Sequence, residues 1–143
     1  MVPEGVTIEE RGRGLDELIP IFEEVLSIAE QFVDGVSRKG RFLGAFKKTL
    51  LEKSDQYPFL DPFRGEFEYR EGTISFTGDV KEKEFFRGVG ECLLATLSQM
   101  DEELPKKKML SLKLRVEIES TLEPHRETIK RLGLDSVLPS FFQ

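Results

Sequence analysis

The chain has 143 residues and a net charge of −6, with 38% hydrophobic and 34% charged residues. This length suits one ordinary domain with its own apolar core, and the composition is that of a globular protein. Negative charge repels the phosphates of nucleic acids and the anionic surface of membranes, so we expect neither as a partner. The single cysteine, Cys92, excludes an internal disulfide framework and favours a reducing, cytoplasmic location.

The chain also lacks asparagine and has only four glutamines among many glutamates and lysines. Few thermolabile amides together with abundant Glu and Lys are typical of thermophilic proteins. GC-biased codon usage is an alternative cause of the missing asparagine, so thermophily is one of two interpretations of this composition.

Two helices are expected in the N-terminal half, after an irregular arm over residues 1–14. Glycines interrupt the end of the arm, and apolar residues at three- and four-residue steps then predict a helix over 19–36. Pro20 suits the first turn of this helix, where the missing N–H costs nothing. The apolar stripe is broader than one contact with a core needs, so we expect it between two layers or at a subunit interface. A second helix is predicted over 40–53.

An aromatic loop follows the second predicted helix. Two prolines, Pro58 and Pro62, prevent the helix from continuing, and large apolar side chains between them predict a packed loop. The chain has twelve phenylalanines and no tryptophan, and either the core of one copy or a self-association surface has to bury them. The candidate interface or ligand-binding residues are Tyr57, Phe59, Asp61, Phe63, Phe141, Phe142, Ile21 and Ile28.

The segment 66–77 predicts a β-hairpin with a two-residue turn at Glu71 and Gly72. This turn brings all four bulky side chains of the two strands to one face, whereas a three-residue turn would divide them between the faces. Gly72 supplies the positive φ that a tight turn needs, and Glu71 is a poorer turn residue than Asn or Asp. The facing pairs in this register are Phe67 with Phe76, Glu68 with Ser75, Tyr69 with Ile74 and Arg70 with Thr73.

After the hairpin we expect a helix, a strand and a short helix. Strict alternation of apolar and polar residues over 109–119 favours a long strand with one buried and one exposed face. A helix is the alternative for this segment, but it leaves Leu112 and Val116 without a buried position. A short helix over 124–132 and an apolar tail over 133–143 complete the chain.

Together these elements predict a single α+β domain over 1–143, with a small, mainly antiparallel sheet packed by helices in the order α-α-β-β-α-β-α. Gly88 and Gly90 fall inside the helix after the hairpin, where glycine lowers helix propensity. We expect them to permit the close approach of another backbone, such as that of the sheet.

No constellation of catalytic residues stands out in the sequence. The only histidine, His125, fits an ordinary exposed residue as well as a phospho-accepting or general-base histidine. Cys92 is expected to be a buried, inert thiol. A metal site needs three or four ligands, and nitrogen and sulfur ligands are too few here, so we expect no metal and no cofactor. A carboxylate- or metal-dependent hydrolase that uses Asp61, Glu66 and Glu68 is the remaining enzymatic alternative.

We therefore expect a cytoplasmic, non-enzymatic interaction or regulatory module that forms a two-fold homodimer through its first helix and aromatic loop. The main alternative is a small-molecule sensor with an aromatic-lined apolar pocket reached from that loop. The basic cluster within 38–48 is expected to be a solvated helix face, with phosphate binding as the alternative.

Overall fold

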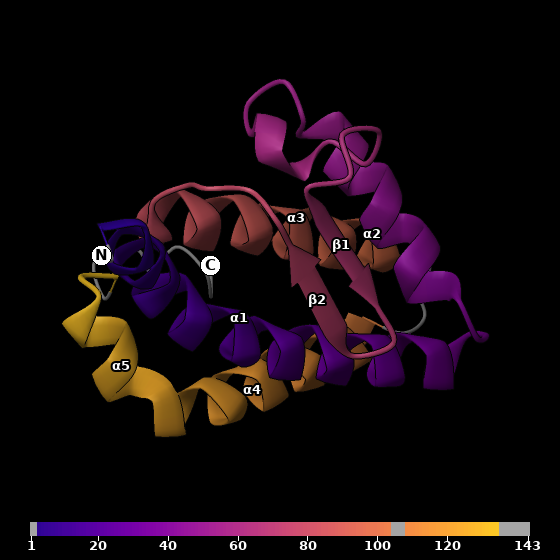
Figure 1. Cartoon of the computed structure of the whole chain (residues 1–143). Coiled ribbons are helices and arrows are strands. Elements are labelled where there is room, and N and C mark those ends of the chain that lie inside the picture. The colour runs from indigo at the N-terminus through magenta and orange to yellow at the C-terminus, as the bar shows by residue number, and fades with distance from the viewer. Residues whose placement is uncertain (1–2, 104–107, 135–143) are drawn as a thin grey trace.

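Helix α1 runs through the middle of the computed structural model, which describes residues 3–103 and 108–134. Helix α4 lies along one side of α1 and also contacts α3, and the hairpin and α2 lie with α3 on the other side of α1 (Figure 1). Within the described residues the sheet has two antiparallel strands packed by helices, which confirms the predicted α+β class. The elements are α1 (Pro3–Val36), α2 (Arg41–Glu52), the 3-10 helix η1 (Pro58–Leu60), β1 (Phe67–Arg70), β2 (Thr73–Phe76), α3 (Glu82–Glu103), α4 (Lys108–Leu122), the 3-10 helix η3 (Glu123–His125) and α5 (Arg126–Arg131).

The β1–β2 hairpin forms in the predicted register, with all four facing pairs as expected from a two-residue turn. The inward side chains Phe67, Tyr69 and Ile74 are buried, so the apolar face packs against the helices. Glu71 and Gly72 have φ values of 48° and 84°, and positive φ at both central residues defines a type I′ turn. Glycine enters this region freely, whereas a side chain at Glu71 makes it costly.

Helix α1 is longer than the predicted helix over 19–36. It begins at Pro3, so the segment 1–14, expected to be an irregular arm, is helical over its described part. Pro20 therefore lies inside the helix and not in its first turn. Its side chain is exposed. Leu15, five residues before it, is buried, and such packing stabilises a helix that contains glycines and a proline.

The predicted strand over 109–119 is wrong, because this segment is part of helix α4. Leu112 and Val116, whose expected burial favoured a strand, are 57% and 63% exposed. The side of α4 that packs on the domain needs only one apolar residue per turn. Over 112–122, where the side chains are described, its buried residues are Leu114, Ile118 and Leu122.

Two carboxylates of α1 satisfy backbone groups of neighbouring elements. Asp34 accepts hydrogen bonds from the N–H groups of Gly40 at 3.0 Å and Phe42 at 2.9 Å, which caps the start of α2. Glu23 accepts a hydrogen bond from the N–H of Ile74 at 2.8 Å. This N–H points to the outer edge of β2, so α1 blocks that edge and a third strand cannot pair there.

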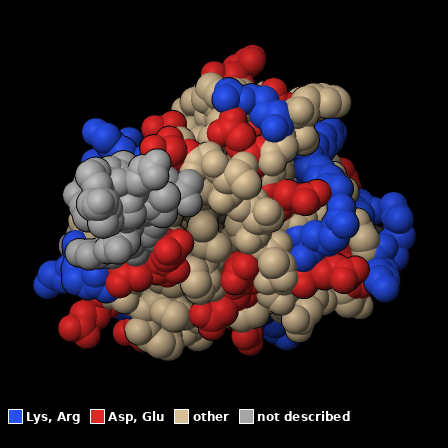
Figure 2. Space-filling model, in the orientation of Figure 1, with Lys and Arg blue, Asp and Glu red and all other residues tan. Residues whose placement is uncertain are grey.

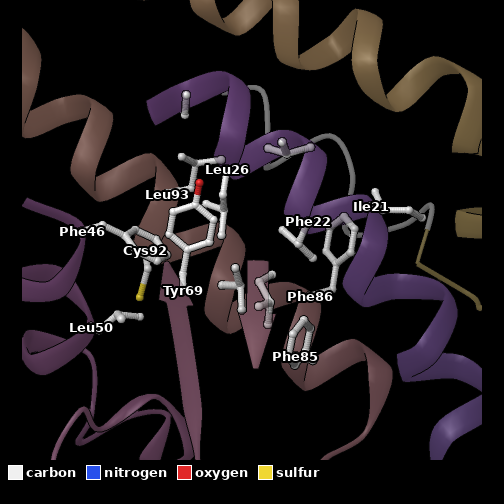
Figure 3. Packing of buried hydrophobic residues seen from close by; sticks show 14 of the residues in the cluster. Ile21, Phe22, Leu26, Phe46, Leu50, Tyr69, Phe85, Phe86, Cys92 and Leu93 are labelled. Atoms are coloured by element: carbon white, nitrogen blue, oxygen red, sulfur yellow. The ribbon is translucent and has the colours of Figure 1, made fainter. Parts of the chain in front are cut away.

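The core is aromatic on the hairpin side of α1. Phe22 meets Phe85 and Phe86 of α3 edge-on, with ring centroids 5.8 and 5.4 Å apart (Figure 3). Tyr69 of β1 lies edge-on to Phe46 of α2, with centroids 6.2 Å apart. Among the phenylalanines that the structure describes, Phe63 alone is exposed. One copy of the chain therefore hides nearly all of these aromatic side chains.

Candidate functional site

The aromatic loop over 57–63 is mostly part of the core. Tyr57 and Phe59 are buried, and both rings approach Gly88 of α3. A Cβ atom at Gly88 would lie only 3.0 Å from the ring of Phe59. The glycine thus admits the aromatic loop, and not the backbone of the sheet as expected. The Tyr57 hydroxyl donates a hydrogen bond to Glu91 Oε2 at 2.7 Å, which ties the loop to α3.

The remaining predicted interface residues do not gather on one surface. Asp61 Oδ1 accepts a hydrogen bond from the N–H of Phe63 at 2.9 Å, which shapes the exposed end of the loop. The Phe63 ring is 86% exposed. Ile21 is buried, and Ile28 is half-buried against the core. Outside the described residues lie Phe141 and Phe142.

A small pocket of about 200 Å³ opens between α2 and β1 beside this loop. Antiparallel geometry turns the N–H and C=O groups of Phe67 and Tyr69 away from β2, toward the side on which α2 lies. The Tyr69 hydroxyl itself is engaged, because it donates to Glu30 at 2.7 Å and accepts from Gly72 N–H at 3.1 Å. Burial and the bond to Glu30 raise the pKa of Tyr69 far above its usual value. The pocket is lined by Leu43, Phe46, Lys47, Leu50, Pro62, Gly65, Phe67, Glu68 and Tyr69.

A second surface, on the outer side of α4, is aliphatic and exposed. Leu112 and Val116 lie one helical turn apart on the same side of the helix. An open groove of about 740 Å³ lies beside Val116 and continues onto η3. Its lining residues are Val116, Glu119, Ser120, Glu123 and Pro124. We define the α4 outer face as Leu112, Lys113, Val116, Glu119, Ser120 and Glu123.

Leu112 and Val116 were expected on the buried face of a strand. The signal for a surface was present, since a helix through this segment leaves both residues without a buried position. The contacts that decide between helix and strand are with α1, which is distant in the sequence, so the local pattern did not resolve the choice.

Charges along α4 are ordered by sign. Lys113 and Arg115 precede Val116, and Glu117 and Glu119 follow it. The helix dipole favours the reverse order, with acidic groups near the N-terminus and basic groups near the C-terminus. Helix α4 has no acidic residue in its first turn and no basic residue in its last. None of these four side chains forms an ion pair with another side chain that the structure describes.

His125 and Cys92 both have structural contacts. His125 Nε2 lies 2.8 Å from Glu24 Oε2, which links η3 to α1. Cys92 is fully buried, and its Sγ lies 4.0 Å from the carbonyl oxygen of Thr49 on α2. Burial raises the pKa of the Cys92 thiol to about 12, so it carries almost no reactive thiolate at neutral pH. This agrees with the inert thiol expected from the sequence.

Of the three carboxylates proposed for a hydrolase, Glu66 and Glu68 are paired with arginines, and Asp61 accepts the hydrogen bond from Phe63 N–H. Glu66 Oε2 lies 2.6 Å from Arg64 Nη2, and Glu68 Oε2 lies 3.3 Å from Arg70 Nη2. Over residues 3–103 and 108–134, no group of three His, Cys, Asp or Glu side chains is placed to hold a metal ion. Among the described helices, none combines the length and the apolar character needed to span a bilayer.

The basic cluster within 38–48 lies at the edge of the molecule. Figure 2 shows Lys and Arg atoms along the right side of the view, where α2 lies in Figure 1. Arg41 forms an ion pair with Glu103 of α3. A hydrogen bond from Gln99, together with one from Arg41, lowers the pKa of Glu103. Lys47 and Lys48 are exposed. Lys47 and Lys48 thus lie on a solvated face of α2. Arg38 and Lys39 precede the helix, and Arg41 joins α2 to α3.

Similarity to known proteins gives no guide to the role of these surfaces. What the pocket and the α4 outer face do has to follow from their own shape and charge. The chain matches no protein-family model, no curated protein and no solved structure.

Proposed function

We propose that the protein is a non-enzymatic interaction module of the cytoplasm that binds a protein surface through its α4 outer face. The observation that carries this proposal is the exposure of Leu112 and Val116 side by side, next to an open groove. Burying each of these side chains against a partner would contribute on the order of 1 to 2 kcal/mol. Exposed apolar residues that are contiguous are typical of interaction sites.

This surface differs from the one expected from the sequence. Ile21, Tyr57 and Phe59 belong to the core of one copy, so a partner would reach them only after the domain opens. Leu112 and Val116 are reached without any rearrangement. The interaction proposal therefore remains, and its surface moves from α1 and the aromatic loop to α4.

The test is a double substitution, Leu112→Ser with Val116→Ser, examined in extract of the cells that express the protein. Because both side chains are exposed, we expect the free energy of unfolding of one copy to change by less than about 0.5 kcal/mol. We expect the wild-type chain to sediment as a species larger than the 16.4 kDa of one copy, and the double variant as one copy.

A matched control is Leu51→Ser on α2, since Leu51 is also an exposed leucine of a helix, at 47%. It should leave the sedimentation of the wild type unchanged. A wild-type chain that sediments as one copy in the extract would contradict the proposal, as would a double variant that keeps the larger species.

We propose small-ligand binding as a second candidate function, because of the aromatic-lined pocket between α2 and β1. At about 200 Å³ this pocket is smaller than most ligand sites, which begin near ~300 Å³, so a ligand of few heavy atoms fits it best. We expect indole or phenol to raise the midpoint of thermal unfolding of the wild type. Leu43→Trp, which fills the pocket from its wall, should abolish this rise. A rise that survives in Leu43→Trp would exclude the pocket as the binding site.

A further inference from the structure

We infer that the partner of the α4 outer face is a second copy of the same chain, with the two α4 helices antiparallel about a two-fold axis through Val116. This inference rests on the proposed function and adds to it the identity of the partner and the geometry of the contact. Closed two-fold dimers are the commonest soluble oligomers, and they place the same surface of each copy against itself.

The charges of α4 are self-complementary in this arrangement. Lys113 and Glu119 lie three residues before and after Val116, and about 60° to either side of it at 100° per residue. A two-fold axis that lies in the contact at Val116 reverses the direction along the helix and leaves each side chain on its own side of the contact. Each Lys113 therefore lies at the same level as Glu119 of the second copy, across the contact, which brings two equivalent pairs of opposite charge near each other. Arg115 and Glu117 are related in the same way and lie farther out, at the rim.

Other arrangements of two α4 helices bring like charges together. If the axis passed through Leu114, Leu112 of one copy would face Val116 of the other, and Lys113 would lie opposite Arg115. Two parallel helices in register would place each Lys113 beside Lys113 of the second copy. Like charges that face each other across a contact disfavour that arrangement. Of these three arrangements, the antiparallel contact centred on Val116 is the one that pairs opposite charges.

The order of charges that disfavours α4 in one copy is offset by this contact. Within one copy, the basic residues lie toward the N-terminal end of the helix dipole, and the acidic residues lie toward its C-terminal end. An antiparallel second helix brings Glu117 and Glu119 alongside the basic half. The sign order of α4, which does not stabilise an isolated helix, therefore has a physical role in a dimer.

The groove beside Val116 has a matching occupant in the dimer. Leu112 lies four residues before the axis, so it lies at the level of the position four residues after it, Ser120 of the second copy. Ser120 lines the groove together with Val116 and Pro124. Leu112 and Val116 of each copy are then covered by the second copy. Helix α4 has 15 residues and spans only about 22 Å, so we expect a weak dimer with a dissociation constant on the order of tens of micromolar.

The experiment is sedimentation equilibrium of the purified full chain from 5 to 500 μM with two single charge reversals, Lys113→Glu and Glu119→Lys. We expect each single variant to dimerise at least tenfold more weakly than the wild type, because each creates two like-charged pairs. An equimolar mixture of the two should form a heterodimer, since every facing pair is then opposite in charge. The double variant Lys113→Glu with Glu119→Lys should regain the homodimer.

Both residues are exposed, so the midpoint of thermal unfolding of each variant should match that of the wild type. As controls, Lys83→Glu and Glu84→Lys make the same charge changes on exposed positions of α3 and should leave dimerisation unchanged. A wild type that is one copy at 500 μM overturns this inference, and so does a mixture of the single variants that fails to associate. If the purified chain is a single copy but a complex in cell extract still depends on Leu112 and Val116, the proposed function holds and the second copy is excluded as the partner.

Discussion

The two sides of α1 are held by different kinds of contact. On the hairpin side, α1 contributes a cluster of interlocking aromatic rings around Phe22 and carboxylates that bind backbone N–H groups, as Asp34 and Glu23 do. On the α4 side, the packing is a single aliphatic stripe with exposed polar contacts at its edge, between His125 and Glu24 and between Arg131 and Glu17. Exposed polar contacts contribute little to stability, so we expect the α4 layer to be the less firmly fixed of the two. This layer also bears Leu112 and Val116, which are exposed.

Phe22→Ala should have the largest effect on stability, because it removes a ring from the center of the aromatic side. We expect a loss of about 3 to 5 kcal/mol in the free energy of unfolding, since the cavity would be surrounded by rigid rings that do not collapse into it. Equilibrium unfolding in urea measures this loss. A loss below about 2 kcal/mol would show that the aromatic side is not the principal core.

Ile118→Ala tests the opposite layer and should cost less, about 2 to 3 kcal/mol. Because Ile118 belongs to the single apolar stripe of α4, the loss should be partly local. Hydrogen exchange of the native wild type should show that α4 and α5 open at a lower free energy than α2 and α3. This difference should be larger in Ile118→Ala. Equal protection of all four helices from hydrogen exchange would contradict the expected difference in stability between the two sides of α1.

The local sequence pattern predicted an element correctly where the residues of that element alone determine its structure. The register of the hairpin follows from the alternation of its strands and from Gly72, and the structure has that register. Alternation over 109–119 was equally regular, but it coincides with a helical stripe through Leu114 and Ile118. Glu23 of α1 blocks the outer edge of β2, so the sheet offers no place for a third strand there. That contact joins residues far apart in the sequence, and no local pattern reveals it.

The candidate site shows the same limit. Aromatic composition predicted that Tyr57 and Phe59 need a buried environment, and they have one. Whether the core or a partner provides it depends on Gly88, which makes room for both rings on α3. Gly88 was expected to lie against the sheet, and the number of aromatic residues alone led to an interface as the expected environment of the loop.

Asp34→Ala should remove the cap that joins α1 to α2. We expect a loss of about 1 to 2 kcal/mol in the free energy of unfolding, because the N–H groups of Gly40 and Phe42 lose their acceptor. Asp34→Asn keeps one acceptor oxygen and should lose roughly half as much. Urea unfolding of both variants checks this order, and equal losses would mean that the charge of Asp34 matters more than its hydrogen bonds.

Glu71→Asn should stabilise the hairpin by about 0.5 to 1 kcal/mol. Glu71 has a φ of 48°, in the left-handed region that costs most side chains about 1 to 2 kcal/mol and that asparagine tolerates better. Glu71→Ala is the control, because alanine keeps the cost and should bring no gain. An increase in the urea midpoint for alanine equal to that for asparagine would assign the gain to the removed charge.

The smallest effect is expected from Tyr57→Phe and concerns alkaline pH. Burial, together with the hydrogen bond to Glu91, raises the pKa of Tyr57 from its ordinary value of 10.0 to about 12. The folded state therefore holds the phenol proton more tightly than the unfolded state does, and the resulting stabilisation is complete below pH 10 and lost as the pH rises toward 12. Urea midpoints of the wild type should fall over this range, and those of Tyr57→Phe should fall less. The fall of the urea midpoint with pH should not vanish in Tyr57→Phe, because burial also raises the pKa values of Tyr69 and Cys92. An unchanged slope would show that the aromatic loop leaves the core before Tyr57 loses its proton, so that the loop is less tightly held than the rest of the aromatic side.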